Sequence, residues 1–162
     1  MATLTISGGV VDQLSSASPN SNVNDFDKWV ARVTAALAKV HSISTFPLAA
    51  LPAGAVVSKA TLQLVYSYNF LPGEDPVGLI VAIHRVTETW VDAQVTWNSR
   101  STGVSWTTPG GTFATEKATF ANPANDYDLV EVDVTSLIDW NSVPISLDVI
   151  MKYDNETVQQ YE

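Results

Sequence analysis

No cysteine occurs anywhere in the sequence, which excludes disulfide bonds, thiol catalysis and thiolate metal sites. Basic residues are scarce: 8 Lys and Arg stand against 17 Asp and Glu, giving a net charge of −9. Without a stripe of basic side chains to neutralise phosphates, we expect no nucleic-acid partner. The same charge argues against anionic membrane surfaces and, more weakly, against polyuronate sugars.

Long apolar runs are also missing. The longest, such as "GLIVAI", are far too short to span a bilayer, so we expect no membrane insertion. The amino-terminal stretch "MATLTISGGVVDQLSS" lacks a basic region and a long apolar region, and is therefore no Sec signal peptide. We expect a virion, cell-surface or extracellular location, reached without Sec export or after removal of a leader.

Catalytic motifs are absent as well. The only two histidines, His41 and His84, lie in separate candidate strands, and no GxSxG, HExxH or Gly-rich phosphate loop occurs. Glu88 and Asp92 are nominal glycosidase carboxylates, but nothing in the sequence marks a cleft around them. The sequence therefore predicts no enzyme, no catalytic residue and no bound cofactor.

What the sequence does contain is a regular alternation of apolar and polar residues. In "KATLQLVYSY", Leu62 and Leu64 point to one side while Thr61 and Gln63 point to the other, which predicts a half-buried strand. The apolar run 79–86 predicts a strand that is buried on both faces. We predict the main strands at 60–68, 79–86, 115–120, 127–134 and 145–153.

Turn signals such as "LPAG", "LPGEDP" and "TPGG" separate these runs, and no amphipathic helix of ten residues is present. The one helical candidate is a short turn near 135–140, which Thr135 or Ser136 could cap. We therefore predict an all-β protein, an antiparallel β-sandwich that forms a single domain over residues 1–162.

Three ordered motifs carry a family resemblance: "LPAGAVVSKATLQL" (51–64), "IHRVTETWVDAQVTWN" (83–98) and "VEVDVTSLIDW" (130–140). Together they resemble the DNRLRE-type domain, over roughly residues 40–153. The resemblance implies a jelly-roll-like β-sandwich of the kind found in repeats of secreted and surface proteins, including carbohydrate-binding modules.

The sequence also departs from that family pattern. Pro47 follows Phe46 where the family usually has Asp, and only "ETVQQY" remains for the final strand of the family. One sheet edge is therefore expected to be short or completed by another molecule.

The aromatic and acidic residues of these motifs have two interpretations. As interior scaffolding, the indoles would fill a corner of the sandwich while Arg85 pairs with Glu88, Asp92 or Asp133. As a sugar platform, the aromatics would be exposed and coplanar. We predict the structural role for the motif residues, which are Arg85, Trp90, Asp92, Trp97, Asp133 and Trp140. Trp106, in "GVSWTTPGG", is the candidate for an exposed sugar-stacking ring.

Calcium is the one ion that the sequence favours at all. Asn125, Asp126 and Asp128 in "NPANDYD" offer hard oxygen ligands from one loop. The alternative is a turn held by side-chain-to-backbone hydrogen bonds, which we favour because the ligand order of an EF-hand is missing.

Two function classes remain open. The first is a non-enzymatic structural or adhesion module, a decoration or fibre unit on a virion or surface assembly. Its expected partners are other protein subunits, copies of itself among them. The second is a carbohydrate-binding module that recognises a polysaccharide through exposed aromatics. Because a fold alone does not set a function, the resemblance does not decide between them, and we favour the structural module.

Overall fold

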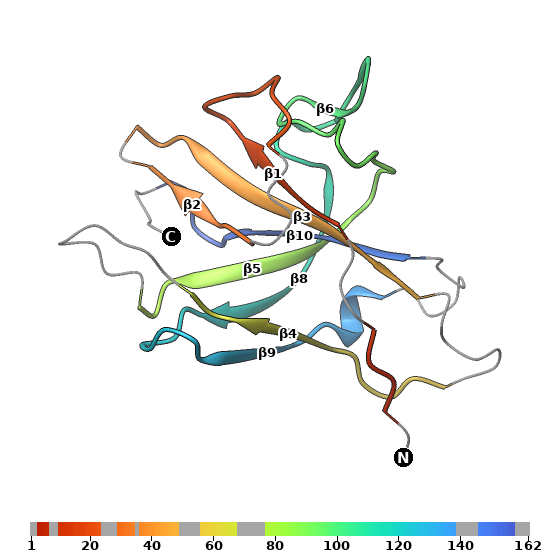
Figure 1. Cartoon of the computed structure of the whole chain (residues 1–162), viewed down its shortest axis with the longest axis vertical. Helices are drawn as coiled ribbons and strands as arrows, with labels where there is room; N and C mark the ends of the chain where they lie inside the picture. The colour runs from red at the N-terminus through yellow and green to blue at the C-terminus, as the bar shows by residue number, and fades with distance from the viewer. Residues whose placement is uncertain are drawn as a thin grey trace.

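The computed structural model places most of the chain in short strands (Figure 1). It describes residues 3–6, 10–23, 29–34, 36–48, 56–67, 77–138 and 146–157. The elements are β1 (Val11–Ser15), β2 (Arg32–Val33), β3 (Lys39–Pro47), β4 (Thr61–Val65), β5 (Ile80–Val86), β6 (Ser99–Ser101), β7 (Val104–Ser105), β8 (Phe113–Ala121), β9 (Leu129–Asp133), the 3-10 turn η1 (Thr135–Leu137) and β10 (Ser146–Tyr153).

A large sheet has the order β1-β3-β10-β5-β8, with β2 added beside β3. The pairings between these strands are antiparallel. β10 lies at the centre, between β3 and β5, although it is the last strand in the sequence. The fold therefore depends on pairings between segments that are far apart along the chain.

A small antiparallel sheet of β4 and β9 packs on one face of the large sheet, which we call the inner face (Figure 1). Its alternation is the predicted one: Leu62 and Leu64 pack inward, while Thr61 and Gln63 are exposed. Between the two sheets lies the inner core. Its buried members are Ala31, Val33, Leu48, Val81, Ile83, Ala118, Val130, Val132, Val134, Leu137, Ile138, Leu147, Val149, Met151 and Tyr153.

The opposite, outer face of the large sheet is covered by residues 87–112, which we call the covering segment. Its ends meet where Thr87 N–H donates to the carbonyl of Thr112 at 3.0 Å. The hairpin β6–β7 lies within it. Under it is a second cluster, the outer core, made of Leu14, Ile43, Val86, Val95, Trp106 and Ile150. Strand β10 is consequently buried on both faces rather than on one.

These features confirm the predicted all-β sandwich with one short helical turn. The predicted cap is wrong: Val134 occupies the N-cap position of η1, and no side chain caps it. Instead Asp133 accepts hydrogen bonds from both the backbone N–H and the hydroxyl of Thr135. Among the described residues, no helix has the length and hydrophobicity that crossing a bilayer requires.

Candidate functional site: a pocket beside Trp90

Trp90 lies in the covering segment, shortly after β5 ends at Val86. The ring is half-buried and packs against the outer core. Its indole Nε1–H donates a hydrogen bond to Oδ1 of Asp148 on β10 at 3.3 Å. The tryptophan is therefore fixed at one edge to the large sheet while part of its surface remains open.

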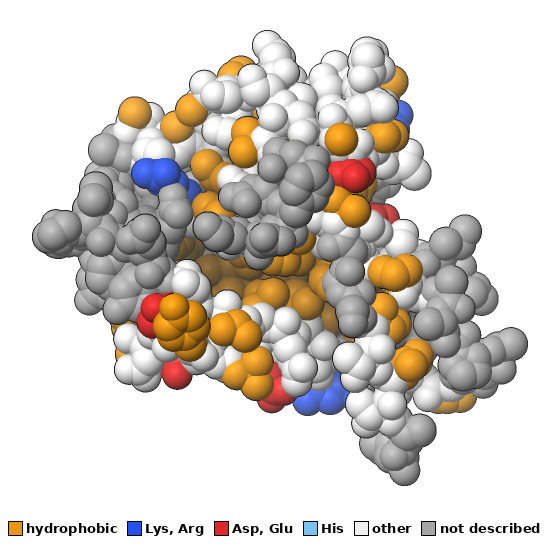
Figure 2. All heavy atoms as spheres, viewed as in Figure 1, with side chains coloured by type: hydrophobic (Ala, Val, Ile, Leu, Met, Phe, Trp, Pro, Cys, Tyr) orange, Lys and Arg blue, Asp and Glu red, His pale blue; other side chains and the backbone are white. Residues whose placement is uncertain are grey.

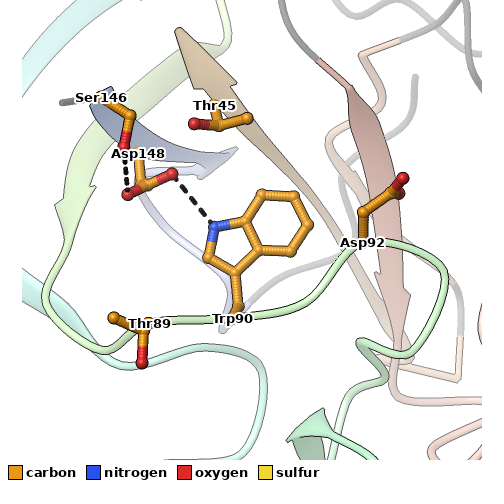
Figure 3. Close-up of a pocket in the computed structure, with 6 residues that line it drawn as sticks. All are labelled: Thr45, Thr89, Trp90, Asp92, Ser146 and Asp148. Carbon is orange, nitrogen blue, oxygen red and sulfur yellow. Dashed lines mark hydrogen bonds between the residues drawn. The ribbon is translucent and has the colours of Figure 1, made fainter. Parts of the chain in front are cut away.

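An open pocket of about 300 Å³ lies beside this ring (Figure 3). The large sheet contributes Thr45 and Asp148, which are direct cross-strand partners and so point to the same face. The covering segment supplies the opposite wall. The lining residues are Thr45, Thr89, Trp90, Asp92, Ser146 and Asp148. The pocket thus combines an aromatic ring, two carboxylates and three hydroxyls.

Asp148 is held in place from two sides (Figure 3). Trp90 donates to one carboxylate oxygen, and the hydroxyl of Ser146 donates to the other at 3.3 Å. These two donors fix the orientation of the Asp148 carboxylate, and each of its oxygens keeps a lone pair for a further donor. Its geometry suits the binding of a hydroxyl group.

Asp92 forms a carboxyl pair with Asp12, a fully buried residue of β1. Burial, together with a hydrogen bond to Asp92 and the negative charge of Asp92, raises the pKa of Asp12 from 3.8 to about 6. The backbone N–H of Ala93 and the amide of Asn22 donate to Asp12 at 3.4 and 3.5 Å and oppose this rise only in part. The covering segment next to the pocket thus packs against a buried carboxyl group of the large sheet.

The far end of the covering segment is held by a buried polar network around His41. Both ring nitrogens face acceptors: Nδ1 is 2.7 Å from the carbonyl of Gly110, and Nε2 is 2.6 Å from Glu156. A neutral imidazole has only one N–H, so both contacts are hydrogen bonds only when the ring is protonated. Lys152 and Lys39 also contact Glu156, at 3.3 and 3.5 Å.

Glu156 is the anion that balances these cations. Burial alone would raise its pKa, but the hydrogen bond and charge of His41, with the charges of Lys152 and Lys39, lower the pKa of Glu156 to about 2. The ring of Trp97 packs on His41 with a centroid separation of 4.8 Å. At Gly110, a Cβ would lie 2.8 Å from that indole, so the close contact requires glycine.

Comparison with protein families gives one match: the model of the disaggregatase related repeat domain matches residues 12–158. The chain belongs to that family. Among curated proteins, none is detectably similar to it in sequence. The resemblance to DNRLRE-type domains stays a prediction, as do the functions drawn from it.

In this disaggregatase related repeat domain, Trp106 is not the exposed ring that the sequence suggested. It is 4% exposed and belongs to the outer core, and its Nε1–H donates to the carbonyl of Thr96 at 3.0 Å. The prediction of an exposed Trp106 is wrong because the chain turns toward the large sheet directly after the exposed hairpin, where Trp106 packs with Leu14, Ile43 and Ile150. A buried indole offers no face to a sugar.

The other motif residues that the structure describes do not gather at one place. Trp90, Asp92 and Trp97 all belong to the covering segment, whereas Asp133 orients Thr135 beneath the small sheet. Trp140 and the predicted "LPAG" turn at 51–54 lie outside the described residues.

Arg85 does not make the ion pairs considered for it. It pairs across the sheet with Val149 and so points to the inner face, whereas Asp92 belongs to the covering segment on the outer face. In the described part of the chain it forms no ion pair with Glu88, Asp92 or Asp133. Because successive side chains of a strand point to opposite faces of the sheet, Arg85 and Asp92 lie on opposite sides of it.

In the loop proposed for calcium, the side chains bond to one another and to the backbone. Asn125 donates from Nδ2 to Asp128 at 3.1 Å, and Asp126 accepts from the N–H of Tyr127 at 3.2 Å. Within the described ranges, no group of three or more His, Cys, Asp or Glu side chains is arranged to hold a metal ion. These bonds support the turn interpretation, and calcium stays a prediction.

Sequence reasoning missed Asp12, Thr45, Ser146 and Asp148. The alternation in 145–153 puts Asp148 on the polar side of its strand, but nothing in the sequence indicates that a distant segment covers that side. The only available signal was an acidic residue at the start of each of two apolar strands, in "VDQL" and "SLDV".

Proposed function

We propose that this repeat domain is a non-enzymatic binding module of a larger surface assembly, and that it binds a neutral polysaccharide in the pocket beside Trp90. One observation supports the proposal above the others. A partly open indole, a pre-oriented carboxylate and three hydroxyls line one open pocket of about 300 Å³.

Sugars fit these groups chemically. The C–H face of a pyranose ring packs on an aromatic surface, and its hydroxyls donate to carboxylates and exchange hydrogen bonds with Ser and Thr. Asp148 supplies an acceptor, and Thr45 supplies a donor and acceptor. Because the chain has a net charge of −9, neutral sugars are favoured over uronates or sulfated glycans.

The two pocket carboxylates do not have the arrangement of a glycosidase pair. A glycosidase needs one carboxyl that is protonated and able to reach the scissile oxygen. Asp148 already accepts hydrogen bonds from Trp90 and Ser146, and the carboxyl group with a raised pKa, Asp12, is fully buried and out of reach of a bound sugar. We therefore propose binding without hydrolysis.

A panel of neutral oligosaccharides on a glycan array, followed by calorimetric titration, tests this function. We expect Trp90→Ala and the isosteric Thr45→Val to weaken binding at least about tenfold, a loss of roughly 1.4 kcal/mol. Thr45→Val guards against unfolding, because valine keeps the shape and β-propensity of the side chain.

Glu131→Gln is the matched control, since it removes an exposed negative charge from the small sheet on the other side of the large sheet. It should leave the affinity unchanged. No binding across the panel, or equal loss in the control, would refute the proposed function. Release of new reducing ends would refute its non-enzymatic part.

A purely structural role, as a decoration or adhesion unit held by protein contacts, is the second candidate. One observation favours it: Val65 and Leu129 are cross-strand partners at the end of the small sheet and are 64% and 59% exposed, with Tyr127 beside them at 75%. Hydrophobic side chains also gather between the two sheets on the face shown in Figure 2. Apolar surface of this kind is typical of an interface between subunits or repeats.

The structural role can be tested separately from sugar binding. If the apolar end joins copies of the chain, analytical ultracentrifugation should find an oligomer that the double variant Val65→Ser, Leu129→Ser converts to monomer. The exposed pair Gln63→Ser, Glu131→Ser on the same two strands is the control. A monomeric wild-type protein at high concentration would count against self-assembly through this surface.

A further inference from the structure

The two residues that flank Trp90 in the chain are both held by Arg100 of β6. The guanidinium Nη1 of Arg100 donates to the carbonyl of Thr89 at 2.9 Å and to the hydroxyl of Thr89 at 3.1 Å. On the other side of the ring, the backbone N–H of Val91 donates to the carbonyl of Arg100 at 2.9 Å. A single residue thus fixes the backbone before and after the indole.

These bonds matter because burial does not hold the two flanking residues. Thr89 and Val91 are both exposed. The hydrogen bond of the Trp90 indole to Asp148, at 3.3 Å, is longer than the usual N–H···O distance. Arg100 is not one of the residues that line the pocket, so it acts on the pocket through the residues that it holds.

Arg100 itself belongs to a part of the covering segment that is anchored in the outer core. Just before it, the N–H of Thr96 donates to the carbonyl of Ser99 at 2.7 Å, and the hydroxyl of Thr96 accepts from the N–H of Ser99 at 3.0 Å. The N–H of the buried Trp106 donates to the carbonyl of Asn98 at 3.1 Å. Arg100 therefore connects the half-buried Trp90 to residues that are fixed by the core.

The guanidinium group has no competing role in charge pairing. Arg100 is the only Lys or Arg in the covering segment. Glu88, the acid next to Thr89, accepts hydrogen bonds from the N–H and the hydroxyl of Thr107. Among the described residues, no ion pair involves Arg100. Its side chain thus serves the wall of the pocket.

We propose that Arg100 is the positioning residue of this pocket: by holding Thr89 and Val91, it keeps the ring of Trp90 in the orientation that a bound polysaccharide requires. The proposal rests on the proposed function. A ring that is already in place loses little conformational freedom when a ligand binds. Without Arg100 the ligand has to order the ring, which should weaken binding about five- to tenfold.

The first arm of the test needs no sugar and follows the Trp90 indole signal in the ¹⁵N–¹H spectrum. Arg100→Met keeps the length of the side chain but removes its donors, so the signal should shift and broaden. Arg100→Lys should restore it, because the ammonium group still donates to Thr89. Gln94→Met is the matched control: the Gln94 side chain holds the same hairpin by accepting from the N–H of Thr102 at 3.0 Å. It should leave the Trp90 signal in place.

The second arm is calorimetric titration with cellohexaose, mannohexaose and xylohexaose. Any of them that binds should bind about five- to tenfold more weakly to Arg100→Met, and with wild-type affinity to Gln94→Met. Arg100→Lys should recover most of the loss. In a Trp90→Ala background, Arg100→Met should cause no further loss, because a residue that acts through Trp90 then has no ring to position.

Three results would overturn the proposal: an unchanged Trp90 signal in Arg100→Met, an equal loss of affinity in Gln94→Met, or a full additional loss in the Trp90→Ala background. The last would mean that Arg100 contacts the sugar directly. If no sugar binds to the wild-type protein, the proposed function fails, and the role of Arg100 in binding fails with it. A Trp90 signal that still depends on Arg100 would then show that the positioning is correct and the ligand is wrong.

Discussion

Replacing Trp106 by alanine is expected to destabilise the protein by about 3–5 kcal/mol, the usual cost of emptying a buried tryptophan site. Its side chain is 4% exposed and fills the outer core beneath the covering segment. The change also leaves the carbonyl of Thr96 without the indole N–H that it accepts. Urea denaturation followed by circular dichroism measures the loss.

The control is Val104→Ala in the same hairpin, because Val104 is 39% exposed. It should change the free energy of unfolding by less than about 0.5 kcal/mol. If Trp106→Ala behaved like this control, the covering segment could not be packed on the large sheet as described. Trp106→Phe should fall between the two, since it keeps an aromatic ring but loses the hydrogen bond.

The second large effect is expected from Glu156→Gln, about 3 kcal/mol of destabilisation at neutral pH. The side chain of Glu156 is 11% exposed and is the partner of His41, Lys152 and Lys39. Glutamine keeps the shape and one acceptor but leaves buried cations without an anion. Chemical denaturation at pH 7 tests this, with the exposed Glu131→Gln as the matched charge change.

The destabilisation caused by Glu156→Gln should depend on pH, and the direction of this dependence follows from the lowered pKa of Glu156. The pKa of Glu156 is lowered from 4.5 to about 2, so its contribution is complete above pH 4.5 and is lost as the pH falls through 2. The difference between the wild-type protein and Glu156→Gln should therefore shrink from pH 5 to pH 2. A difference that stays constant over this range would mean that charge is not what Glu156 contributes.

Most of the fold could be predicted from the alternation of apolar and polar residues along the strands. The strands β4 and β9 show one polar and one apolar side, so their period and their exposed faces follow directly from the sequence. The central strand β10 also alternates, but its polar side is covered. The period of the pattern shows which side chains are polar but not which distant segment covers them, so alternation alone would place Asp148 and Lys152 at the surface.

The candidate site was harder to predict for the same reason. Trp90 and Asp148 are 58 residues apart in sequence and meet only because β10 inserts between β3 and β5. The error at Trp106 has a related cause: its position between glycines and a proline is typical of an exposed loop, yet the chain turns inward at Trp106, directly after the exposed hairpin. In β1, Asp12 points to the opposite face of the sheet from Val11, as alternation predicts. Its proximity to Asp92 in the covering segment could not be predicted, because the two residues are far apart in the sequence.

The most direct measurement for the proposed function is the set of five tryptophan indole signals in the ¹⁵N–¹H spectrum while neutral oligosaccharides are added. The proposed function predicts that the Trp90 signal shifts with ligand concentration and saturates, while the signal of buried Trp106 stays in place. A binding sugar that shifts another indole and leaves Trp90 unchanged would contradict it.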